Sequence, residues 1–482
     1  MSKSLERDFT KKGGGSSEQH KNKEALEGSE RESNQFLFQL ESKLLANREL
    51  SSLSPEEQFR IIADKVANHP EAITPVPTPS SNELLQLLRQ AKKENKALTI
   101  KFGIDPTGSE MHLGHAVPLL MLRRFQQMGH KIQFVVGDFT ARIGDPSGRI
   151  TARPPLTEEQ IQENMRSYFE QAELILDLRK SKVETFYNSE WLGKMTMQEW
   201  LPLLQRINAS QIIQREDFQK RLKSGGSISM AELMYALFMA YDSVVLKPDI
   251  EVGGIDQLLN LYWCRELMKI KGLKSEVLIV TNLLAGTSGE IDSEGRMMKM
   301  SKSLKNYISI TEKPSEMYGK VMSIPDEIMW MWFRELTEIS SSELEELKSK
   351  VQDGNVHPME AKRMLARVIV GTFNHHDKNI VNEAERNFNQ KFGKQKQLVP
   401  DDIETVTAPY SSKLIDVLSN TTGISKSGLR RMLTSSEKGG IRILRGDNYF
   451  PLTMDDLNNQ RMEDEIIVRI GRKRYYRIKP IK

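Results

Sequence analysis

The sequence of 482 residues contains a single cysteine, Cys264, which excludes an internal disulfide and a cysteine-rich metal site. It contains no apolar run near the roughly 20 residues that a membrane span needs. Residues 1–34 lack the apolar core of a secretory signal, and their many acidic side chains argue against an organelle transit peptide. These absences predict a cytoplasmic protein that does not enter a membrane.

An excess of charge of one sign is also missing, because the net charge is only +4. This balance does not by itself indicate a nucleic-acid partner, so the position of the positive charges matters more. Lysines and arginines become frequent after residue 408, with aromatic residues interleaved among them. Such a cluster in a small folded unit is typical of phosphate contacts.

Two short motifs carry most of the information about function. The motif HLGH at residues 112–115 follows a strand-like run, 98–104, and precedes a helical run, 116–125. The motif KMSKS at residues 299–303 lies in a Gly/Ser/Lys-rich stretch that predicts a loop. A helix N-terminus attracts phosphate oxygens, and lysines on a loop can meet negative charge that develops in a transition state. Together the motifs predict a phosphate-bearing ligand between two distant stretches of chain.

The region around these motifs alternates between helical and strand-like runs. The pattern predicts helices at 82–93, 116–128 and 255–270, and strands at 98–104, 131–136 and 277–280. This alternation indicates an α/β fold with a doubly wound, Rossmann-like parallel sheet and a ligand site at the C-terminal strand ends. The predicted organisation is a disordered tail (1–34), a helical segment and linker (35–81), the Rossmann-like domain (82–310), an α-helical domain (311–394), a linker (395–407) and a small α+β domain (408–482).

The two motifs resemble the HIGH and KMSKS signatures of class I aminoacyl-tRNA synthetases. Three further segments resemble motifs of the tyrosyl-tRNA synthetase family: GIDPTG at 103–108, GDFTARIGDPSG at 137–148, and Tyr235 with Asp242 followed by GGIDQ at 253–257. Segments 425–431 and 440–443 resemble an S4 RNA-binding domain. The resemblance, to the bacterial type with a C-terminal S4 domain, covers about residues 50–482. It implies that 82–310 is catalytic, that 311–394 lies on the anticodon side and that 408–482 is S4-like.

The resemblance implies attack of a carboxylate on the α-phosphate of ATP, followed by acyl transfer to the 3′ end of tRNA. Such a reaction needs positioning and charge stabilisation more than a protein nucleophile. The implied catalytic residues are Thr107, His112, His115, Lys299 and Lys302. The implied ATP-binding residues are Gly103, Asp105, His112, Gly114, His115, Gly254, Asp256, Lys299, Met300, Ser301 and Lys302. Mg²⁺ is expected to accompany ATP without dedicated protein ligands.

The amino-acid site implied by the family consists of Lys101, Asp145, Tyr235, Met239, Asp242 and Gln257. Asp145 and Tyr235 would hold the α-ammonium group, and Asp242 would accept the phenolic hydroxyl of L-tyrosine. Tyr235, Met239 and Asp242 stand at i, i+4 and i+7, so one helical face presents all three. A buried polar group matched to one hydroxyl discriminates strongly against its absence, for which tyrosyl-tRNA synthetase against phenylalanine is a known example.

Four positions depart from the family pattern. Met239 replaces a glutamine, Ile255 stands where Ser or Thr follows Gly-Gly, and Lys305 stands where glycine is common. Lys101 stands where many members have tyrosine, although one branch carries lysine. Two alternatives to a tyrosine–tRNA ligase follow: a paralogue that adenylates another aromatic acid for biosynthesis, and a synthetase-derived RNA-binding protein. The intact HLGH and KMSKS motifs argue against the second.

The expected partners are tRNA(Tyr), L-tyrosine, ATP and a second copy of the chain in a homodimer. The candidate RNA-binding residues of the C-terminal region are Lys426, Arg430, Arg431, Arg442, Arg472, Lys473 and Arg474.

Overall fold

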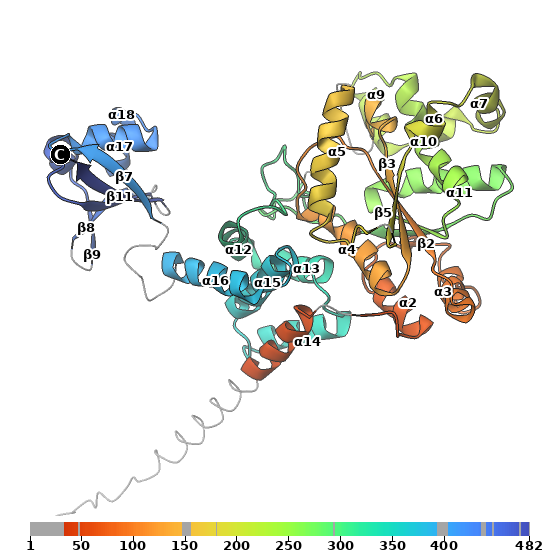
Figure 1. Ribbon diagram of the computed structural model, residues 1–482, viewed down its shortest axis with the longest axis horizontal. Coiled ribbons are helices and arrows are strands. Elements are labelled where there is room, and N and C mark those ends of the chain that lie inside the picture. The colour runs from red at the N-terminus through yellow and green to blue at the C-terminus, as the bar shows by residue number, and fades with distance from the viewer. Residues whose placement is uncertain are drawn as a thin grey trace, which may run out of the picture. The chain divides into compact units, whose positions relative to one another are not determined.

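The structure is a computed structural model, and it describes residues 33–46, 49–146, 156–179, 181–292, 295–392, 403–434, 440–445, 448–471 and 474–481. The chain forms two compact units (Figure 1). The first comprises residues up to Lys313 and Lys320–Asp377, and the second comprises Pro314–Gly319 and Lys378–Lys482. The predicted tail 1–34 lies outside the described residues except for positions 33 and 34, which belong to a helix at 33–44.

The first unit is built on a six-stranded sheet. In spatial order its strands are β1 (Ile73–Thr74), β6 (Val277–Thr281), β5 (Ile250–Gly254), β2 (Thr99–Ile104), β3 (Lys131–Val136) and β4 (Val183–Tyr187). All neighbours pair in parallel except β1, which is antiparallel to β6. The strand order reverses direction between β2 and β5, which creates the switch point where doubly wound sheets bind ligands. The predicted Rossmann-like sheet is therefore confirmed.

Strand β1 lies within residues 35–81, for which the sequence predicts a helical segment and a linker but no strand. Ile73 and Thr74 pair with Ile279 and Leu278 and add an edge to the sheet. A strand of two residues is too short to give the period-2 pattern by which strands are recognised in a sequence.

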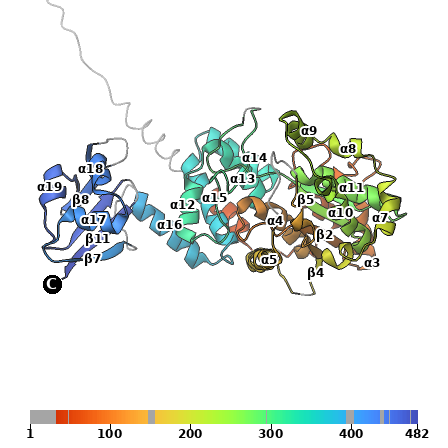
Figure 2. The same cartoon turned by 90° about the horizontal axis from the view of Figure 1, so that it is seen from above.

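Several helices of the first unit begin at residues whose side chains cap them. Between residues 55 and 313 the α-helices are α2 (Pro55–Ala63), α3 (Glu83–Glu94), α4 (Leu113–Gln127), α5 (Glu158–Ala172), α6 (Ser189–Leu192), α7 (Met197–Leu204), α8 (Ala209–Ile213), α9 (Glu216–Lys223), α10 (Met230–Leu246) and α11 (Leu258–Ile270). Asn82 caps α3 by accepting from the Leu85 N–H, and Ser229 forms a capping box with Glu232 at the start of α10. Helices α10 and α11 lie side by side (Figure 2).

The helical segment predicted as a separate domain is divided between the two units. Its helices are α12 (Pro314–Met322), α13 (Asp326–Leu336), α14 (Ser341–Gln352), α15 (Pro358–Thr372) and α16 (Lys378–Phe392). Helices α13, α14 and α15 belong to the unit that contains the sheet. Trp332 on α13 is fully buried and donates from Nε1 to the Ala285 carbonyl at 3.1 Å, which joins this helix to the loop after β6.

The N-terminal helix, residues 33–44, packs against the same helical group. Leu40 and Leu44 are buried, and Glu41 accepts two hydrogen bonds from Arg367 on α15 at 2.7 and 2.8 Å. Lys43 pairs with Glu343 on α14. These contacts join a segment at the start of the chain to helices more than halfway along it.

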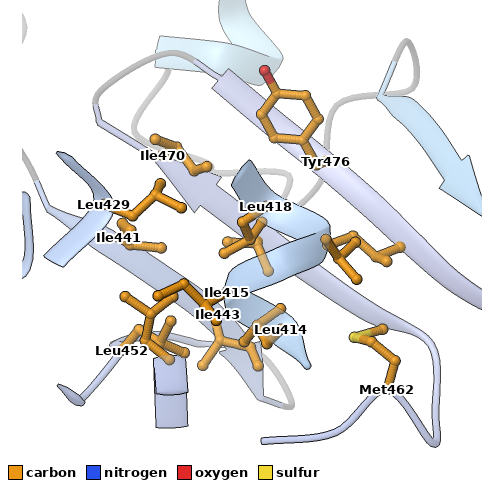
Figure 3. Packing of buried hydrophobic residues seen from close by; sticks show 14 of the residues in the cluster. Leu414, Ile415, Leu418, Leu429, Ile441, Ile443, Leu452, Met462, Ile470 and Tyr476 are labelled. Carbon is orange, nitrogen blue, oxygen red and sulfur yellow. The ribbon is translucent and has the colours of Figure 1, made fainter. Parts of the chain in front are cut away.

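The second unit has its own sheet and core (Figure 3). Its strands, in spatial order, are β7 (Glu404–Pro409), β11 (Arg474–Ile481), β10 (Ile466–Ile470), β8 (Ile441–Arg445) and β9 (Asn448–Pro451), and its helices after residue 403 are α17 (Leu414–Thr422), α18 (Lys426–Thr434) and α19 (Met454–Asn459). Alternate strand residues such as Ile441, Ile443 and Ile470 face this core. Strand β7 begins inside the predicted linker 395–407, whose residues 395–402 lie outside the described part. In the described part of the chain, no helix is long and apolar enough to cross a membrane.

Candidate active site

A cavity of about 570 Å³ opens at the C-terminal ends of β2 and β5, at the switch point of the sheet. The start of α4 and the loop that carries KMSKS also line it. The predicted residues that the structure places around it are Gly103, Asp105, Thr107, His112, Gly114, His115, Asp145, Tyr235, Met239, Asp242, Gly254, Asp256, Gln257, Lys299, Met300, Ser301 and Lys302. Side chains from distant stretches of chain therefore share one space large enough for a nucleotide and a small acid.

Backbone pairing holds the two motifs together. The Leu113 N–H donates to the Ile308 carbonyl at 3.0 Å, and His112 forms an antiparallel bridge with Ser309. The Met300 N–H donates to the Leu284 carbonyl at 2.8 Å, which ties KMSKS to the loop after β6. The helix start and the basic loop are thus fixed to one another through the chain that immediately follows KMSKS.

The HLGH motif builds the N-terminus of α4 from its own imidazoles. His112 is the N-cap, and its Nδ1 accepts from the Gly114 N–H at 3.1 Å. The Nδ1 of His115 accepts from the His112 N–H at 3.2 Å, which completes a capping box in which histidines replace the usual Ser and Glu. The helix begins at Leu113, three residues before the predicted helical run, because these caps satisfy its first N–H groups.

Both imidazoles are held in the neutral form. Burial, followed by the charge of Lys302, lowers the pKa of His112 to about 4. Burial and the neighbouring His112 lower the pKa of His115 to about 3. At neutral pH each ring therefore carries one N–H that can donate to phosphate oxygen without adding a fixed positive charge.

Gly114 has a local reason to be glycine. A Cβ at this position would lie 3.0 Å from the Cε1 and Nδ1 atoms of His112 and 3.6 Å from the Cβ of Met300. The residue therefore lets the N-cap ring fold back onto the helix start, in addition to leaving the approach to the helix open.

The KMSKS motif is a loop, as its composition predicts, and the side chain of Asn306 holds its backbone in place. Asn306 accepts from the Ser301 N–H at 2.8 Å and donates to the Lys299 carbonyl at 3.3 Å. Met300 is buried beneath the loop, whereas Lys299 is exposed and its Nζ lies 3.3 Å from Asp256 Oδ2. The loop therefore aims its polar side chains at the cavity while its hydrophobic residue holds it to the fold.

Helix α10 presents Tyr235, Met239 and Asp242 to the cavity, as their spacing predicts. The Tyr235 hydroxyl donates to Asp105 Oδ2 at 2.9 Å, and Thr140 Oγ1 donates to Asp105 Oδ1 at 2.6 Å. Asp145 Oδ2 accepts from Gln257 Nε2 at 2.8 Å. Asp105 and Asp145 are thus two carboxylates, preoriented by hydrogen bonds, that could hold an ammonium group.

Asp242 has partners that sequence reasoning missed. Trp191 donates from Nε1 to Asp242 Oδ1 at 2.9 Å, and Asn188 donates from Nδ2 to Oδ2 at 3.4 Å. Both donors follow strand β4, whose C-terminal end points to the same edge of the sheet as β2 and β3. Polar residues directly after a parallel strand are the signal that could have found them. Burial raises the pKa of Asp242 to about 7, although Lys101 and these two donors oppose the rise.

Lys101 does not appear among the described residues that line the cavity, contrary to its predicted contact with the amino acid. It is completely buried, and its Nζ pairs with Glu251 Oε1 at 2.8 Å. Glu251, its direct partner in the β2–β5 register, does line the cavity. Glu251, rather than Lys101, is therefore the member of this ion pair that lines the cavity.

The described residues contain one group of side chains with the spacing of a metal site: Glu251, Cys264 and Glu276. The ammonium group of Lys101 lies 2.8 Å from Glu251 and 4.0 Å from the Cys264 sulfur. The positive charge of Lys101 thus already occupies the position that a metal ion would take. The cluster therefore does not fit a divalent cation.

The candidate RNA-binding residues are distributed over the second unit. Lys426, Arg430 and Arg431 are exposed on α18, and Arg442 and Arg474 are exposed at β8 and β11. Arg442 lies directly opposite Arg469 in the antiparallel register of β8 and β10, on the side of the sheet away from the buried isoleucines. Arg472 and Lys473 lie outside the described residues.

Comparison with known proteins shows the family. Residues 92–393 match the family model of class I tRNA synthetases (W and Y). The chain is 35% identical over 435 residues to the tyrosine–tRNA ligase of Thermotoga maritima, covering 88% of this chain and 98% of that one. It is 38% identical over 428 residues to the tyrosine–tRNA ligase of Aquifex aeolicus, covering 88% and 99%.

Solved structures share the fold. A C-terminally truncated mitochondrial tyrosyl-tRNA synthetase of Aspergillus nidulans aligns with a TM-score of 0.53 at 20% identity, covering 76% of this chain and all of that one. The tyrosyl-tRNA synthetase of Archaeoglobus fulgidus, solved with L-tyrosine, aligns with a TM-score of 0.51 at 21% identity, covering 69% and 99%. With both signature motifs in one cavity and homology over most of its length, the chain belongs to the class I tRNA synthetases of the tryptophan and tyrosine group, and within it to the tyrosine–tRNA ligase family.

Proposed function

We propose that this protein is a tyrosine–tRNA ligase that activates L-tyrosine with ATP and transfers the tyrosyl group to the 3′ end of tRNA(Tyr). The observation that carries the proposal is the meeting of HLGH, KMSKS and Asp242 around a single cavity. The first two surround space beside a helix N-terminus suited to phosphates, and Asp242 is a buried acceptor suited to a hydroxyl group.

ATP would enter between the start of α4 and the KMSKS loop. His112 and His115 are neutral donors there, and Lys302 supplies positive charge for the departing pyrophosphate. Asp256 already accepts from Lys299, so binding of a ribose hydroxyl to Asp256 would release Lys299 toward the phosphates. Asp145 and Asp105 would receive the ammonium group of the amino acid, which orients its carboxylate toward the α-phosphate.

Mg²⁺ would be held by ATP rather than by this chain. Asp105, Asp145 and Asp256 each already accept a hydrogen bond from a neighbouring side chain. Phosphate oxygens and water are the usual ligands of a nucleotide-bound Mg²⁺, which neutralises charge on the phosphates.

The C-terminal unit would bind tRNA as an S4-like domain. Its exposed lysines and arginines on α18, β8 and β11 support this role, because they place several positive charges on one small folded unit. The contacts are expected to be salt-dependent.

A homodimer is part of the proposal. On α7, Met197 is 71% exposed and Leu201, one turn further, is 52% exposed, and Met230 at the start of α10 is 72% exposed. Large apolar side chains left exposed in this way support a protein interface. Light scattering coupled to size-exclusion chromatography tests the stoichiometry, and Met197→Lys/Leu201→Lys should shift the mass toward a monomer.

ATP–pyrophosphate exchange with purified protein across the twenty amino acids tests the activity. Exchange with tyrosine, followed by charging of tRNA(Tyr), is expected. Met239 favours a second candidate, a paralogue specific for another aromatic acid, because its thioether lines the cavity where the family has a glutamine. Exchange only with another acid would support this candidate, and a complete absence of exchange would refute both.

A further inference from the structure

A cluster of buried ionisable groups lies behind the amino-acid end of the cavity. Lys101 Nζ is 2.8 Å from Glu251 Oε1 and donates to Ser243 Oγ at 2.8 Å. Ser243 Oγ lies 3.2 Å from Glu251 Oε2 and 3.0 Å from Glu276 Oε1. Cys264 on α11 lies beside it, with its sulfur 4.0 Å from Lys101 Nζ. The members of the cluster come from β2, β5, α10, α11 and the residue before β6, and the reaction proposed above uses none of them directly.

The hydrogen bonds and the burial of the cluster together indicate which of its groups are charged. Ser243 has one hydroxyl hydrogen, so it can donate to only one of the two glutamates. Burial raises the pKa of Glu276 well above its ordinary value, and the Glu251 charge raises it further. Burial would lower the pKa of Lys101, but the acidic groups around it outweigh burial and raise it. The cluster is therefore an ammonium–carboxylate pair, Lys101 with Glu251, beside a neutral Glu276.

This cluster is connected to Asp242 through both sequence and space. Ser243 follows Asp242 on α10, and Glu251 lines the same cavity as Asp242. The charged and polar groups that act on Asp242 come from β2, β5, the segment after β4 and α10 itself: Lys101, Glu251, Asn188, Trp191 and Tyr235. Lys101 is the only cation among them, and its charge outweighs that of Glu251 in its effect on the pKa of Asp242.

We propose that Lys101 is a positioning residue for substrate selection: paired with Glu251 behind the cavity wall, it keeps a negative charge on Asp242, and this charge selects a ligand with a phenolic hydroxyl. The inference rests on the proposed function and deepens it. A carboxylate is a pure acceptor for a hydroxyl, whereas a protonated carboxyl group tolerates its absence. At this position Lys101 would thus act on the amino-acid substrate through its charge, by way of Asp242, rather than by touching the substrate.

The first test uses the unaltered protein. The kcat/KM for tyrosine in pyrophosphate exchange should fall below pH 7, by about tenfold per pH unit once Asp242 is protonated, because kcat/KM follows ionisation of the free enzyme. The kcat/KM for phenylalanine should not show this fall, so discrimination between tyrosine and phenylalanine should decrease as the pH falls. Discrimination that stays constant from pH 8 to 5.5 would overturn the inference while leaving tyrosine activation intact.

The second test removes the charge. Lys101→Met should shift the fall in kcat/KM for tyrosine to a pH about one unit or more higher. It should raise the tyrosine KM at pH 7 about fivefold or more, with the ATP KM changed less than about twofold. Lys269→Met, an exposed lysine on α11 paired with Glu266, is the matched control and should match the unaltered protein.

Lys101→Met leaves Glu251 buried without its partner and could destabilise the fold. The double variant Lys101→Met/Glu251→Gln removes the pair together, a change that buried ion pairs often tolerate. Lys101 affects the pKa of Asp242 more strongly than Glu251 does. In the double variant, kcat/KM for tyrosine should therefore still begin to fall at a higher pH, and discrimination against phenylalanine should still be reduced. Circular dichroism checks that the double variant is folded. If the folded double variant keeps the original pH dependence of kcat/KM for tyrosine and the original selectivity, the role of Lys101 is refuted. Loss of exchange with tyrosine in the unaltered protein would instead refute the proposed function.

Discussion

Lys299 Nζ lies 3.3 Å from Asp256 Oδ2, so an ion pair joins the KMSKS loop to the turn that follows β5, and both residues line the cavity. Both groups are partly exposed, at 47% and 29%, so the pair itself adds little stability. Under the proposed function, ATP would replace this ion pair by two contacts: Asp256 with the ribose and Lys299 with the phosphates.

Asp256→Asn should therefore weaken ATP binding without unfolding the protein. The variant loses a charged acceptor for the ribose, so we expect the ATP KM to rise about 10- to 100-fold. The tyrosine KM should change little. Pyrophosphate exchange at varied ATP measures the effect, with Glu266→Gln on the surface of α11 as the control. An unchanged ATP KM would show that Asp256 does not contact the nucleotide.

Lys302→Ala should reduce the rate of adenylation while leaving substrate binding nearly intact. Charge that develops on the departing pyrophosphate loses its partner, and loss of one such donor costs about 10²–10³-fold in kcat. Lys305→Ala, in the same loop and exposed, is the matched control. Single-turnover formation of the adenylate measures the step. Equal rates for the two variants would contradict the assignment of the loop.

Acid should destabilise the first unit through its two capping histidines. Their pKa values fall to about 4 and 3 on folding, so the unfolded chain binds more protons between pH 6.5 and 4. This contribution is complete above pH 6.5 and is lost as the pH falls, by about 2 kcal/mol per histidine at pH 5. The melting temperature of His115→Gln should depend less on pH than that of the unaltered protein, whereas His69→Gln, at an exposed site, should behave as the unaltered protein does.

Gly137→Ala should disrupt the amino-acid site. A Cβ there would lie 2.0 Å from Asp105 Oδ1 and 2.3 Å from Thr140 Oγ1, so the carboxylate that Tyr235 contacts must move. We expect a loss of about 1–3 kcal/mol in unfolding free energy and a higher tyrosine KM. Gly319→Ala, where nothing lies within 4 Å of the added Cβ, should lose no stability. Urea denaturation and exchange kinetics measure both quantities.

Arg431→Ala/Arg442→Ala should weaken tRNA charging without affecting amino-acid activation. Each lost phosphate contact should make the slope of log affinity against log salt shallower by about 0.7–0.9. Arg461→Ala, which removes an exposed arginine of the same unit, is the control. An unchanged salt slope would show that these two arginines do not contact tRNA.

Local patterns predicted the central parts of this molecule well. The helix after HLGH, strand β3 and the i, i+4, i+7 face of α10 follow from periodicity and capping, and these elements carry most of the site. The family resemblance implies that Lys101 belongs to the amino-acid site, but its ion pair with Glu251 depends on the pairing of β2 with β5. Register between distant strands is set by tertiary packing, which no local pattern contains.

The hydrogen-bond donors of Asp242 and the packing partners of the helices could not be predicted from local patterns for the same reason. Trp191 and Asn188 reach Asp242 only because β4 joins the edge of the sheet, and that strand is short and half polar. The division of the helical segment between two units depends on which apolar faces meet, as Trp332 shows by donating to Ala285. Helix positions were predictable from periodicity, but the partner of each helix was not.

The short strand β1 has a consequence for the biogenesis of the protein. Every residue of β6 is buried, and without β1 its backbone N–H and C=O groups would form an open, hydrophobic margin of the sheet. Such margins recruit strands from other molecules and lead to aggregation. Strand β1 covers this margin, and it comes before all the other strands of the sheet in the chain. The segment that protects β6 has therefore already been synthesised when β6 leaves the ribosome.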